Sequence, residues 1–407
     1  MNIPATLLQN KKILLGVTGS IASYKSLELV RFFVKAGAEV KVVMSESAKK
    51  FVTPLTFETL TSNRVLDDIN ESWVDDFNHI KTTEWADVFV IAPVTANTMA
   101  KLSQGIADTM LLQCALAFSK KIVLAPSANT NMIHNPITQK NIKTLQNAKY
   151  TFVDTQVKEL ACKTVGDGAM AEPIDIFWAT AKELLQCEFW SDRETIVTGG
   201  GTVEKIDDVR FISNFSSGKM ASSMATALYC RGANVKLIAT KFDTDLPADI
   251  NILKVQETQE MYESVVNAVE HLQANTHKKP YLFMAAAVSD YVPADKQEGK
   301  LKKETIGDEW ELKLTKNRDI LASINKENLM LIGFKAEMDK KSAKVNATNM
   351  LKKKNIDAVC LNVLKDSSSF GTDTNEVEFI TKDKSILIPS AQKLEIAFKI
   401  LENTKNL

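Results

Sequence analysis

Short apolar runs alternate with amphipathic stretches along the first half of the chain. Continuous apolar runs of about four to eight residues are typical of strands buried in a parallel sheet, whereas apolar positions recurring at helical spacing indicate a helix. Such runs occupy residues 12–17, 39–44, 87–92 and 121–125, and helical patterns occupy residues 21–35 and 95–102. This βαβ rhythm predicts an α/β fold built on a doubly wound parallel sheet.

The second half of the chain repeats this alternation. The expected strands cover residues 195–198, 234–239, 281–287, 329–334 and 357–361, and the expected helices cover residues 258–272 and 340–354. Two hairpins are expected, one pairing residues 300–303 with 310–314 around Gly307 and one pairing 376–381 with 384–388. A helix over residues 174–185 ends the first half, and residues 188–193 form a linker. A chain of 407 residues is long for one core, so we expect two Rossmann-like domains, residues 1–190 and 191–407.

The loops after the strands of the first half are rich in small polar residues. In a parallel sheet such loops meet at the carboxyl edge and bind ligands there. They read GVTGSIASYKS, MSESA, APVTANTMAKLSQGIADTML and APSANTNM. Backbone N–H groups and hydroxyls of this kind suit one phosphomonoester and a polar heterocycle. The GxGxxG fingerprint of dinucleotide sites is absent because Gly16 and Gly19 do not fit its spacing, so the loops predict a mononucleotide such as FMN.

Charge and cysteine content narrow the class of protein. The chain carries 50 basic and 50 acidic residues, a balance that argues against a nucleic-acid surface. Its five cysteines are scattered, which fits a reducing cytoplasm and argues against a disulfide framework or a zinc site. No apolar run of about 18 residues occurs, and the N-terminus lacks the apolar core of a signal peptide. We therefore expect a soluble cytoplasmic protein that binds neither nucleic acid nor membranes.

Two side chains in the first half are candidates for reactivity. His79 lies in a polar segment just ahead of an expected strand, and Cys162 lies in a loop with Gly166 and Gly168. A thiol in such a loop is more accessible than Cys114, which falls in an apolar helical pattern. Free cysteines and lone histidines are more often structural than catalytic, so the residues alone leave both roles open. The other histidines lack metal-ligand spacing and are expected to be solvated or to cap helices: His134, His271 and His277.

The second half opens on an unusually polar loop, residues 197–221. The run of Gly199, Gly200 and Gly201 follows a strand, and glycines there let backbone N–H groups approach a phosphate beside the next helix N-terminus. Donors and charged groups separate these glycines from that helix: Asp207, Asp208, Arg210, Asn214, Ser216, Ser217 and Lys219. The sequence SSGKM is not a Walker A loop, because Met220 stands where that loop has Ser or Thr. The loop predicts a phosphate-binding site, with an ordinary strand-to-helix connection as the alternative.

Several motifs carry a resemblance to known families. GVTGSIASYK, His79 ahead of WAD, APVTANTMAKLSQGIAD, PSANTNM and LAC at Cys162 resemble the homo-oligomeric flavin-containing cysteine decarboxylases. The later RFISNFSSGKMA, AAVSDY and FGTDTN resemble phosphopantothenate–cysteine ligase. In this order, and over nearly the whole chain, the motifs resemble the bacterial family of bifunctional phosphopantothenoylcysteine decarboxylase/phosphopantothenate–cysteine ligase, which acts in coenzyme A biosynthesis.

For the first domain the resemblance implies a flavodoxin-like decarboxylase. FMN would transiently oxidise the thiol-bearing arm of the substrate so that its carboxylate can leave as carbon dioxide. By resemblance, His79 would be the active-site base, Asn129 would hold the substrate carboxylate with Met132 nearby, and Cys162 would supply a proton. The residues implied to hold FMN are Gly19, Ser20, Ile21, Ser45, Thr95 and Asn97.

For the second domain the resemblance implies a nucleotide-binding ligase that uses CTP and Mg²⁺. The enzyme would join 4′-phosphopantothenate to L-cysteine through an acyl-cytidylate. Arg210 and Asn214 would hold the carboxylate and Lys300 would assist cytidylyl transfer. The residues implied to face CTP are Gly199, Gly200, Gly201, Asp290, Lys300, Phe334 and Lys354, and no metal ligands are assigned. A homo-oligomer is expected, because the family forms flavoprotein trimers and ligase dimers.

The sequence departs from the family pattern at four positions: Lys163, Ala169, Arg318 and Met350. The first two alter the loop around Cys162, and the last two alter the expected CTP site. Two alternatives remain at this point. One is a flavin-binding regulatory subunit that has lost an activity, and the other is a nicotinamide-dependent oxidoreductase of two Rossmann-like halves. The missing GxGxxG weighs against the second alternative.

Overall fold

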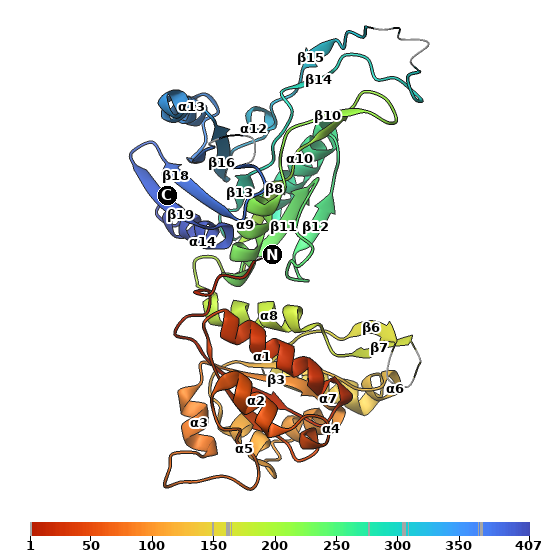
Figure 1. Cartoon of the computed structure of the whole chain (residues 1–407), viewed down its shortest axis with the longest axis vertical. Coiled ribbons are helices and arrows are strands. Elements are labelled where there is room, and N and C mark those ends of the chain that lie inside the picture. Colours follow the sequence, from red (N-terminus) through yellow and green to blue (C-terminus); the bar gives the residue numbers. More distant parts are fainter. Residues whose placement is uncertain are drawn as a thin grey trace. The chain divides into compact units, whose positions relative to one another are not determined.

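The chain divides into two compact units, each of which is described by itself. The computed structural model describes residues 2–148, 150–159, 163, 165–275, 277–302, 307, 309–364, 366 and 369–407. The first unit is Ile3–Leu185, and the second is Gln186–Leu407 together with Asn2 (Figure 1). Among the described residues, no helix combines the length and apolar character needed to cross a membrane.

The first unit alternates strands and helices, as the apolar pattern predicts. In chain order its elements are β1 (Lys12–Val17), η1 (Ile21–Tyr24), α1 (Lys25–Lys35), β2 (Glu39–Met44), η2 (Ala48–Lys50), α2 (Pro54–Thr61), α3 (His79–Trp85), β3 (Val88–Val94), α4 (Ala96–Ser103), α5 (Met110–Ala117), β4 (Ile122–Pro126), α6 (Thr130–Ile133), α7 (Pro136–Asn147), β5 (Thr151–Phe152), β6 (Gln156–Glu159), β7 (Val165–Ala169) and α8 (Pro173–Leu185).

A parallel sheet of order β2-β1-β3-β4-β5 forms the centre of this unit. This is the flavodoxin-like doubly wound order. On one face α1 packs on α8, where the rings of Phe33 and Phe177 lie 5.8 Å apart. On the other face, sheet residues such as Leu14 and Phe89 join a buried cluster with Leu111 of α5. Because helices cover both faces, ligands reach the sheet at its carboxyl edge.

An antiparallel hairpin, β6–β7, follows the sheet and lies against the loop after β4. Ala128 N donates to Gly168 O over 3.1 Å. A Cβ atom placed on Gly168 would lie 1.8 Å from Ala128 O, so this approach requires glycine. The hairpin and the loop therefore have one fixed register.

The second unit contains a larger sheet. In chain order its elements are β8 (Glu194–Gly199), β9 (Val203–Lys205), β10 (Phe211–Ser213), α9 (Lys219–Cys230), β11 (Asn234–Ala239), β12 (Asn251–Lys254), α10 (Thr258–Asn275), β13 (Tyr281–Met284), β14 (Tyr291–Pro293), β15 (Leu314–Lys316), α12 (Ile320–Ser323), β16 (Met330–Glu337), α13 (Lys340–Lys353), β17 (Ala358–Val363), β18 (Thr374–Ile380), β19 (Ser385–Gln392) and α14 (Lys393–Thr404).

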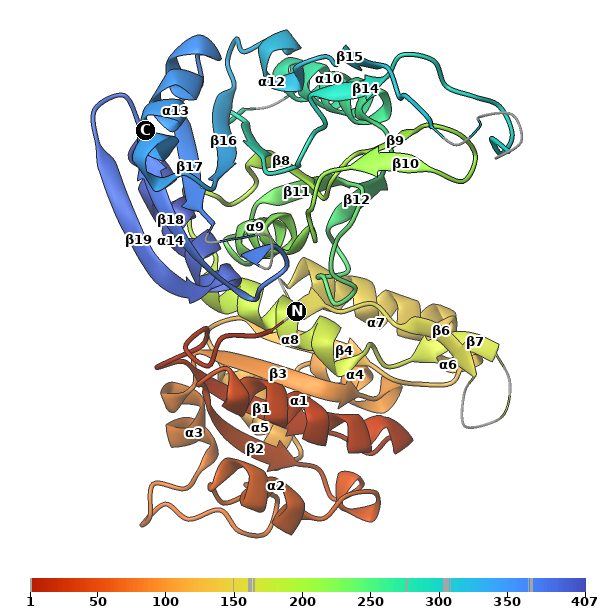
Figure 2. The ribbon, with the colours of Figure 1, turned by 45° about the horizontal axis from the view of Figure 1, so that its top comes forward.

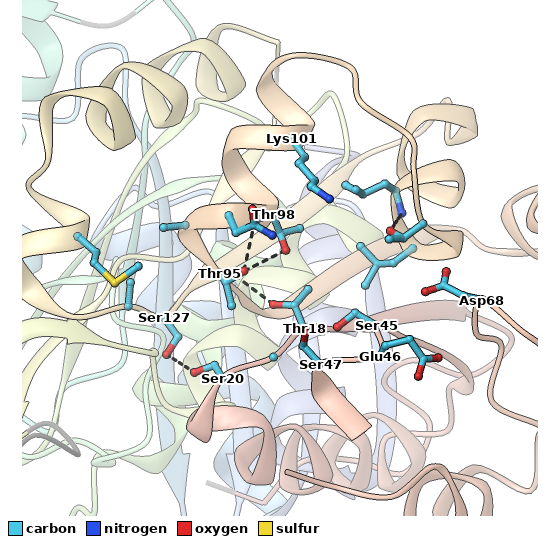
Figure 3. A pocket seen from close by; sticks show the side chains of 18 residues that line it. Thr18, Ser20, Ser45, Glu46, Ser47, Asp68, Thr95, Thr98, Lys101 and Ser127 are labelled. Carbon is cyan, nitrogen blue, oxygen red and sulfur yellow. Dashed lines mark hydrogen bonds between the residues drawn. The ribbon is translucent and has the colours of Figure 1, made fainter. Parts of the chain in front are cut away.

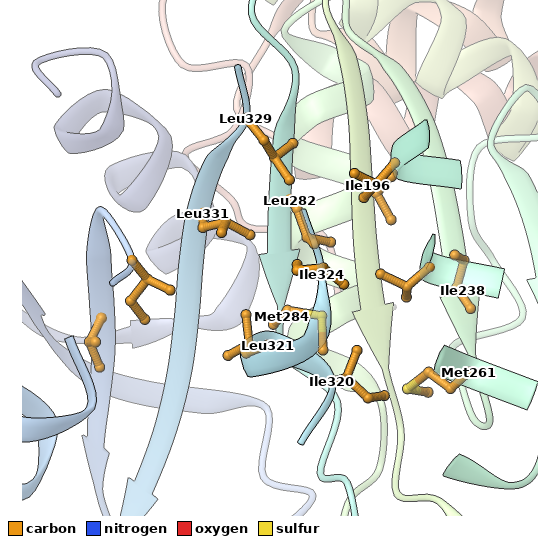
Figure 4. Close-up of a cluster of buried hydrophobic side chains, with 14 of the residues drawn as sticks. Ile196, Ile238, Met261, Leu282, Met284, Ile320, Leu321, Ile324, Leu329 and Leu331 are labelled. Carbon is orange, nitrogen blue, oxygen red and sulfur yellow. The ribbon is translucent and has the colours of Figure 1, made fainter. Parts of the chain in front are cut away.

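The strands of this sheet follow the order β12-β11-β8-β13-β16-β17-β18-β19. The first six are parallel, and their order matches the Rossmann pattern; β18 and β19 add an antiparallel edge. Side chains of neighbouring strands, such as Ile196, Leu282 and Leu331, pack beneath Ile320 and Leu321 of α12 (Figure 4). From β8 the chain adds strands first on one side (β11, β12) and then on the other (β13, β16, β17), so the strand order reverses between β8 and β13, the point where such sheets bind nucleotides.

Two antiparallel pairs, β9–β10 and β14–β15, extend from the sheet on the same side (Figure 2). The buried carboxylate of Asp207 joins them. It accepts from Val209 N at 2.8 Å, Arg210 N at 2.6 Å and Leu301 N at 3.2 Å, and it pairs with the Arg210 guanidinium at 2.7 Å. Burial opposes ionisation of Asp207, but these N–H groups and the Arg210 charge hold its pKa below the ordinary value.

The hairpin predicted from residues 300–303 and 310–314 is wrong. Tyr291–Pro293 pairs with Leu314–Lys316 instead, and the described residues between them form no strand. Of the strand predicted at 310–314, only Leu314 lies in β15, and the partner of β15 comes from the segment after β13. Residue 303 of the predicted hairpin lies outside the described residues.

The linker predicted at residues 188–193 is also wrong, because this segment belongs to the core of the second unit. Trp190 is fully buried, and its ring lies 4.9 Å from Tyr281 and 6.4 Å from Phe283. The guanidinium of Arg193 covers Tyr281 at 5.2 Å. Two adjacent aromatic residues in the segment were the sign of burial, and the boundary between the units falls earlier, after Leu185.

We predict that Trp190→Ala lowers the free energy of unfolding of the second unit by about 3–5 kcal/mol, the usual cost of removing a buried tryptophan. Urea unfolding followed by circular dichroism measures this change. Leu387→Ala is the matched control, because Leu387 lies in the same unit but is 62% exposed; its effect should stay below about 0.5 kcal/mol. A Trp190 variant as stable as the parent protein would show that the segment is not part of the core.

Candidate functional site

A cavity of about 510 Å³ opens at the carboxyl ends of β1, β3 and β4 (Figure 3). We call it the hydroxyl-lined cavity. Its lining residues are Thr18, Gly19, Ser20, Ser45, Glu46, Ser47, Asp68, Thr95, Ala96, Asn97, Thr98, Lys101, Thr109, Leu111, Leu112, Ser127, Ala128 and Met132. The structure thus brings together six residues that the sequence singled out: Gly19, Ser20, Ser45, Thr95, Asn97 and Met132.

Hydroxyl groups tie the loops around this cavity to one another. Thr18 Oγ1 donates to Pro93 O at 2.8 Å and accepts from Thr95 N at 3.1 Å. Ser20 Oγ and Ser127 Oγ lie 3.0 Å apart and share a hydrogen bond. The ends of three neighbouring strands are therefore held at fixed spacing before any ligand arrives.

Helix N-termini and a close backbone approach complete the cavity. Thr95 caps α4 by accepting from Thr98 N at 3.3 Å, so the positive end of that helix faces the cavity. Ser20 caps η1 in the same way, accepting from Ala22 N at 3.2 Å. A Cβ atom on Gly19 would lie 2.4 Å from Ser47 Cβ, so only glycine leaves this part open. Helix ends and hydroxyls together suit a phosphate group.

A second cavity of about 570 Å³ adjoins the first and shares Ser20, Ser127 and Ala128 with it. We call it the hairpin cavity, because the β6–β7 hairpin forms one wall. Its other lining residues are Ile21, Ala22, Tyr24, Lys25, Asn129, Lys158, Glu159, Gly168, Ala169 and Met170. Asn129 caps α6, with its Oδ1 accepting from Asn131 N at 2.9 Å. The sequence-predicted Ile21 and Asn129 therefore lie beside the hydroxyl-lined cavity, in a space that suits a second ligand.

His79 lines neither cavity. It begins α3, and its Nδ1 lies 2.8 Å from Glu71 Oε1. The ring meets Trp73 edge-on at 5.7 Å. Glu71 thus fixes the orientation of the imidazole, but within one chain His79 is not brought to Asn129.

Cys162 lies outside the described residues. Its neighbour Lys163 has φ +63°, a left-handed conformation that glycine adopts more readily. The departure at residue 163 therefore falls where a glycine would be unstrained. Among the described cysteines, Cys114 is buried, and burial raises its thiol pKa to about 12, so it is not a reactive thiol.

The second unit has a smaller cavity of about 170 Å³, which we call the phenylalanine cavity. It lies at the N-terminus of α9, beside the residues that follow β13. Its lining residues are Phe215, Ser216, Ser217, Gly218, Lys219, Met220, Ala221, Ala285, Ala286, Ala287, Phe334, Lys335, Ala336, Cys360, Asn362, Leu364, Ser369, Phe370, Gly371, Asn375, Val377 and Lys393. This position next to the β8–β13 reversal is the usual place for a nucleotide.

Aromatic rings and lysines dominate the chemistry of this cavity. The rings of Phe215 and Phe370 stack with centroids 6.0 Å apart. Lys219 Nζ lies 2.6 Å from Asp373 Oδ1 and donates to Gly371 O at 2.9 Å. Burial, and then the Lys219 charge, lower the pKa of Lys393. A cavity with a flat apolar wall and several ammonium groups suits a base and its phosphates.

Of the residues expected to face CTP, Phe334 lines this cavity and the three glycines do not. Instead the glycines permit close packing. A Cβ atom on Gly199 would lie 2.4 Å from Ala221 Cβ, and one on Gly201 would lie 2.5 Å from Asn214 O. Gly200 has φ +79°, the left-handed conformation. Packing accounts for these glycines, and a role in phosphate binding stays a prediction.

The remaining ligase candidates lie on the segments around β10, β14 and α12. Asn214 Nδ2 donates to Val288 O at 3.1 Å, two residues before Asp290. Arg210 Nη2 donates to Leu301 O at 3.3 Å, next to the exposed Lys300. Arg210 is therefore bonded to the residue that follows Lys300, and Asn214 to a residue two positions before Asp290. None of these four candidates lines the phenylalanine cavity.

The two departures near the expected CTP site have structural explanations. Lys354 Nζ pairs with Asp319 Oδ2 at 2.9 Å. The guanidinium of Arg318, the neighbouring residue, covers the ring of Tyr262 at 4.3 Å. Met350 packs against the buried cluster of this unit. Its Cε atom lies so close to Gly333 that a Cβ atom on that glycine would be only 2.7 Å away. Met350 is therefore a packing residue in this chain.

Sequence reasoning missed several lining residues. In the hydroxyl-lined cavity these include Thr98, Lys101 and Ser127, and in the phenylalanine cavity they include Asn362 and Lys393. Lys101 and Ser127 stood inside loops already singled out, so their place at the carboxyl edge was a usable signal. Lys393 lies far along the chain at the start of α14, and no local pattern marks it.

Comparisons with known proteins agree with this division. Residues 1–185 match the family model described as Flavoprotein, and residues 190–407 match the model of the DNA/pantothenate metabolism flavoprotein C-terminal domain. A solved C-terminal domain of a coenzyme A biosynthesis bifunctional protein CoaBC is 28% identical, with a TM-score of 0.43, and covers 54% of this chain and 97% of its own.

Relatives match over nearly the full length. The coenzyme A biosynthesis bifunctional protein CoaBC of Vibrio vulnificus is 34% identical over 405 residues, covering 98% of both chains. The Bacillus subtilis protein of the same name is 35% identical and covers 97% of both, and the Escherichia coli protein is 32% identical and covers 95% of this chain and 94% of its own. This chain therefore belongs to the family of bifunctional coenzyme A biosynthesis proteins CoaBC.

Proposed function

We propose that this chain catalyses two consecutive steps of coenzyme A biosynthesis. The second unit would use CTP to join 4′-phosphopantothenate to L-cysteine. The first unit would then decarboxylate 4′-phosphopantothenoylcysteine to 4′-phosphopantetheine with FMN. Full-length relatives with both halves in the same order support this bifunctional assignment. In the structure, the observation that carries it is the pair of adjoining cavities that share Ser20, Ser127 and Ala128.

The hydroxyl-lined cavity fits FMN. FMN carries one phosphomonoester and one flat heterocycle, and the cavity offers hydroxyls, capped helix ends and the opening beside Gly19. Ser20, Ser45, Thr95 and Asn97 would hold the cofactor. When bound, FMN supplies the transient oxidation that makes loss of carbon dioxide from the substrate possible. Nicotinamide chemistry finds no support, since GxGxxG is absent.

The hairpin cavity would hold the acyl-cysteine substrate. The Oδ1 atom of Asn129 is occupied by Asn131 N, which orients the Nδ2 amide as the donor to the substrate carboxylate. Met132 would contact the adjoining part of the substrate. Ile21, which the resemblance implied to hold FMN, lines the hairpin cavity and would contact the substrate there. The β6–β7 hairpin would exclude water above it, and Cys162, which falls between β6 and β7 in the sequence, would supply a proton to the substrate.

We further propose that His79 acts as a base in the cavity of a neighbouring copy of the chain. Its ring does not line a cavity of its own chain, and its Nδ1 is fixed by Glu71. The segment ahead of it exposes apolar side chains: Ile69 is 82%, Trp73 63% and Val74 94% exposed, and the Trp73 ring contacts His79. Such a patch is typical of an interface, so a homo-oligomer is proposed for the first unit.

The phenylalanine cavity would hold CTP. A carboxylate becomes an acyl donor only when activated, and nucleotide transfer with loss of diphosphate is one means of activating it. Lys219, Lys335 and Lys393, together with the N-terminus of α9, would balance the phosphate charge. Mg²⁺ would bind mainly through the phosphates, as is usual for this ion.

The carboxylate of 4′-phosphopantothenate would lie beside the nucleotide. Arg210 and Asn214 would hold it, and Lys300 would assist cytidylyl transfer. Facing the nucleotide would be Asp290, Phe334, Lys354 and the glycines 199–201. The scattered free thiols of the described chain suit a reducing cytoplasm, where we place the protein.

We predict that Gly19→Ala weakens FMN binding at least about tenfold, because the new methyl group would collide with Ser47 in the cavity wall. Flavin absorbance of the purified protein and fluorescence titration of the apoprotein measure the change. Thr59→Ala, an exposed change on α2 of the same unit, is the control and should bind FMN normally. Parent protein that purifies colourless and binds no FMN would overturn the flavin assignment.

We predict that Asn214→Ala lowers kcat/KM for diphosphate release from CTP by about tenfold or more, because it removes a donor to the reacting carboxylate. The assay contains 4′-phosphopantothenate, L-cysteine and Mg²⁺. FMN content should not change, since Asn214 lies in the second unit. The exposed Asn251, at the start of β12, gives the control variant Asn251→Ala. Equal rates for both variants would remove Asn214 from the site.

A further inference from the structure

A side-chain pair links the β6–β7 hairpin to the substrate loop of the first unit. His134 follows α6 directly and caps its C-terminus. Its Nε2 donates to Asp167 Oδ2 on β7 over 2.6 Å. The hydrogen bond therefore joins the segment that begins with Asn129 to the hairpin strand that ends at Ala169.

The geometry around this pair leaves little freedom for the hairpin. Next to Asp167, Gly168 O accepts from Ala128 N, and a Cβ atom at residue 168 would overlap Ala128 O. Ala169 carries no polar group that could reach the loop. Of these three residues of β7, Asp167 is the one whose side chain holds the hairpin to the substrate loop.

The carboxylate of Asp167 depends on His134. Within the described part of the chain, its Oδ1 is buried and has no hydrogen-bond partner. Its Oδ2 is the atom that meets His134. Removing the imidazole would leave this carboxylate without a side-chain donor in a partly buried place, which destabilises the contact between β7 and the loop after β4.

The base of the hairpin is held separately. Gln156 Nε2 donates to Asp175 Oδ2 at 2.9 Å, and Lys158 pairs with Glu172. Lys25 Nζ also lies 3.0 Å from Glu172. Burial would raise the pKa of Glu172, but Lys158 and Lys25 outweigh it and lower that pKa. These contacts hold β6 against the start of α8, whereas the His134–Asp167 pair holds β7 against the substrate loop.

We propose that His134 and Asp167 are a positioning pair for the decarboxylase reaction. The pair holds the β6–β7 hairpin against the substrate loop, and so fixes the hairpin cavity around Asn129. Neither residue touches the reacting atoms. The proposal rests on the decarboxylase function proposed above and adds to it two residues that act through the hairpin.

The kinetic test compares His134→Ala, Asp167→Ala and the double variant in the FMN-loaded full-length protein. Each single change should lower kcat/KM for decarboxylation of 4′-phosphopantothenoylcysteine about fivefold to tenfold, with FMN affinity unchanged, as expected for a half-exposed charged hydrogen bond. The double variant should lose no more than either single variant, because the two residues act as one unit. Asp167→Asn keeps an acceptor for His134 and should recover most of the rate.

Lys143→Ala is the matched control. Lys143 is exposed on α7 and lines the same outer cavity as His134 and Asp167, together with Lys140 and Asp154. It should leave kcat/KM unchanged, which separates loss of the pair from a general change of local charge. Losses in the two single variants that simply multiply in the double variant would overturn the proposal.

Hydrogen exchange gives a readout that needs no activity. His134→Ala and Asp167→Ala should speed exchange of peptides covering residues 156–169 about fivefold or more, and should leave peptides of α8 unchanged. Unchanged exchange would overturn the proposal, and so would faster exchange with unchanged kcat/KM. An inactive parent protein would overturn the proposed function itself, whereas the exchange result would still decide whether the pair holds the hairpin.

Discussion

One buried threonine at the end of the first strand holds the functional edge of the first unit together. Thr18 is 2% exposed, and its hydroxyl donates to Pro93 O and accepts from Thr95 N. These bonds link the ends of the parallel strands β1 and β3, between which the strand order of the sheet reverses. They set the N-terminus of α4 beside the loop that holds Gly19 and Ser20. Without this tie, no side-chain hydroxyl described above would join the loop after β1 to the loop after β3.

The second unit uses the same arrangement with different residues. Thr198 lies near the end of β8, the first strand of this unit in chain order, and Thr202 lies just after it; both are fully buried. Thr198 Oγ1 accepts from Ala286 N at 3.2 Å, and Thr202 Oγ1 accepts from Ser289 N at 3.0 Å. These bonds again cross the reversal point, here between β8 and β13. In both units a hydroxyl satisfies backbone groups that would otherwise be left unpaired where neighbouring strands diverge.

The sequence predicted the sheets well and the connections poorly. The strands at residues 12–17, 39–44 and 234–239 coincide with β1, β2 and β11, because continuous apolar runs are a local signal. The meeting of the polar loops at one cavity was also predictable, since parallel strands bring their carboxyl ends together. By contrast, the partner of residues 314–316 and the burial of Trp190 depend on contacts with distant segments. The pairing of His134 with Asp167 could not be predicted from the sequence for the same reason, because 33 positions separate the two residues.

The glycines of the loop of residues 197–221 have two explanations. The sequence predicts a phosphate site, and the structure shows that each glycine also permits close packing against Ala221, Thr240 or Asn214. The charges nearest the phenylalanine cavity come from Lys219 and from Lys393 at the start of α14. Glycine marks a close approach, and only the fold tells whether the approaching group is a ligand or the protein itself.

The central claim is that one chain carries both reactions, and a single incubation tests it. FMN-loaded protein is mixed with CTP, Mg²⁺, L-cysteine and 4′-phosphopantothenate, and mass spectrometry follows the products with time. We expect 4′-phosphopantothenoylcysteine to appear first and 4′-phosphopantetheine to follow, with neither formed when CTP is omitted. Accumulation of the acyl-cysteine without decarboxylation, or the absence of both products, would contradict the account.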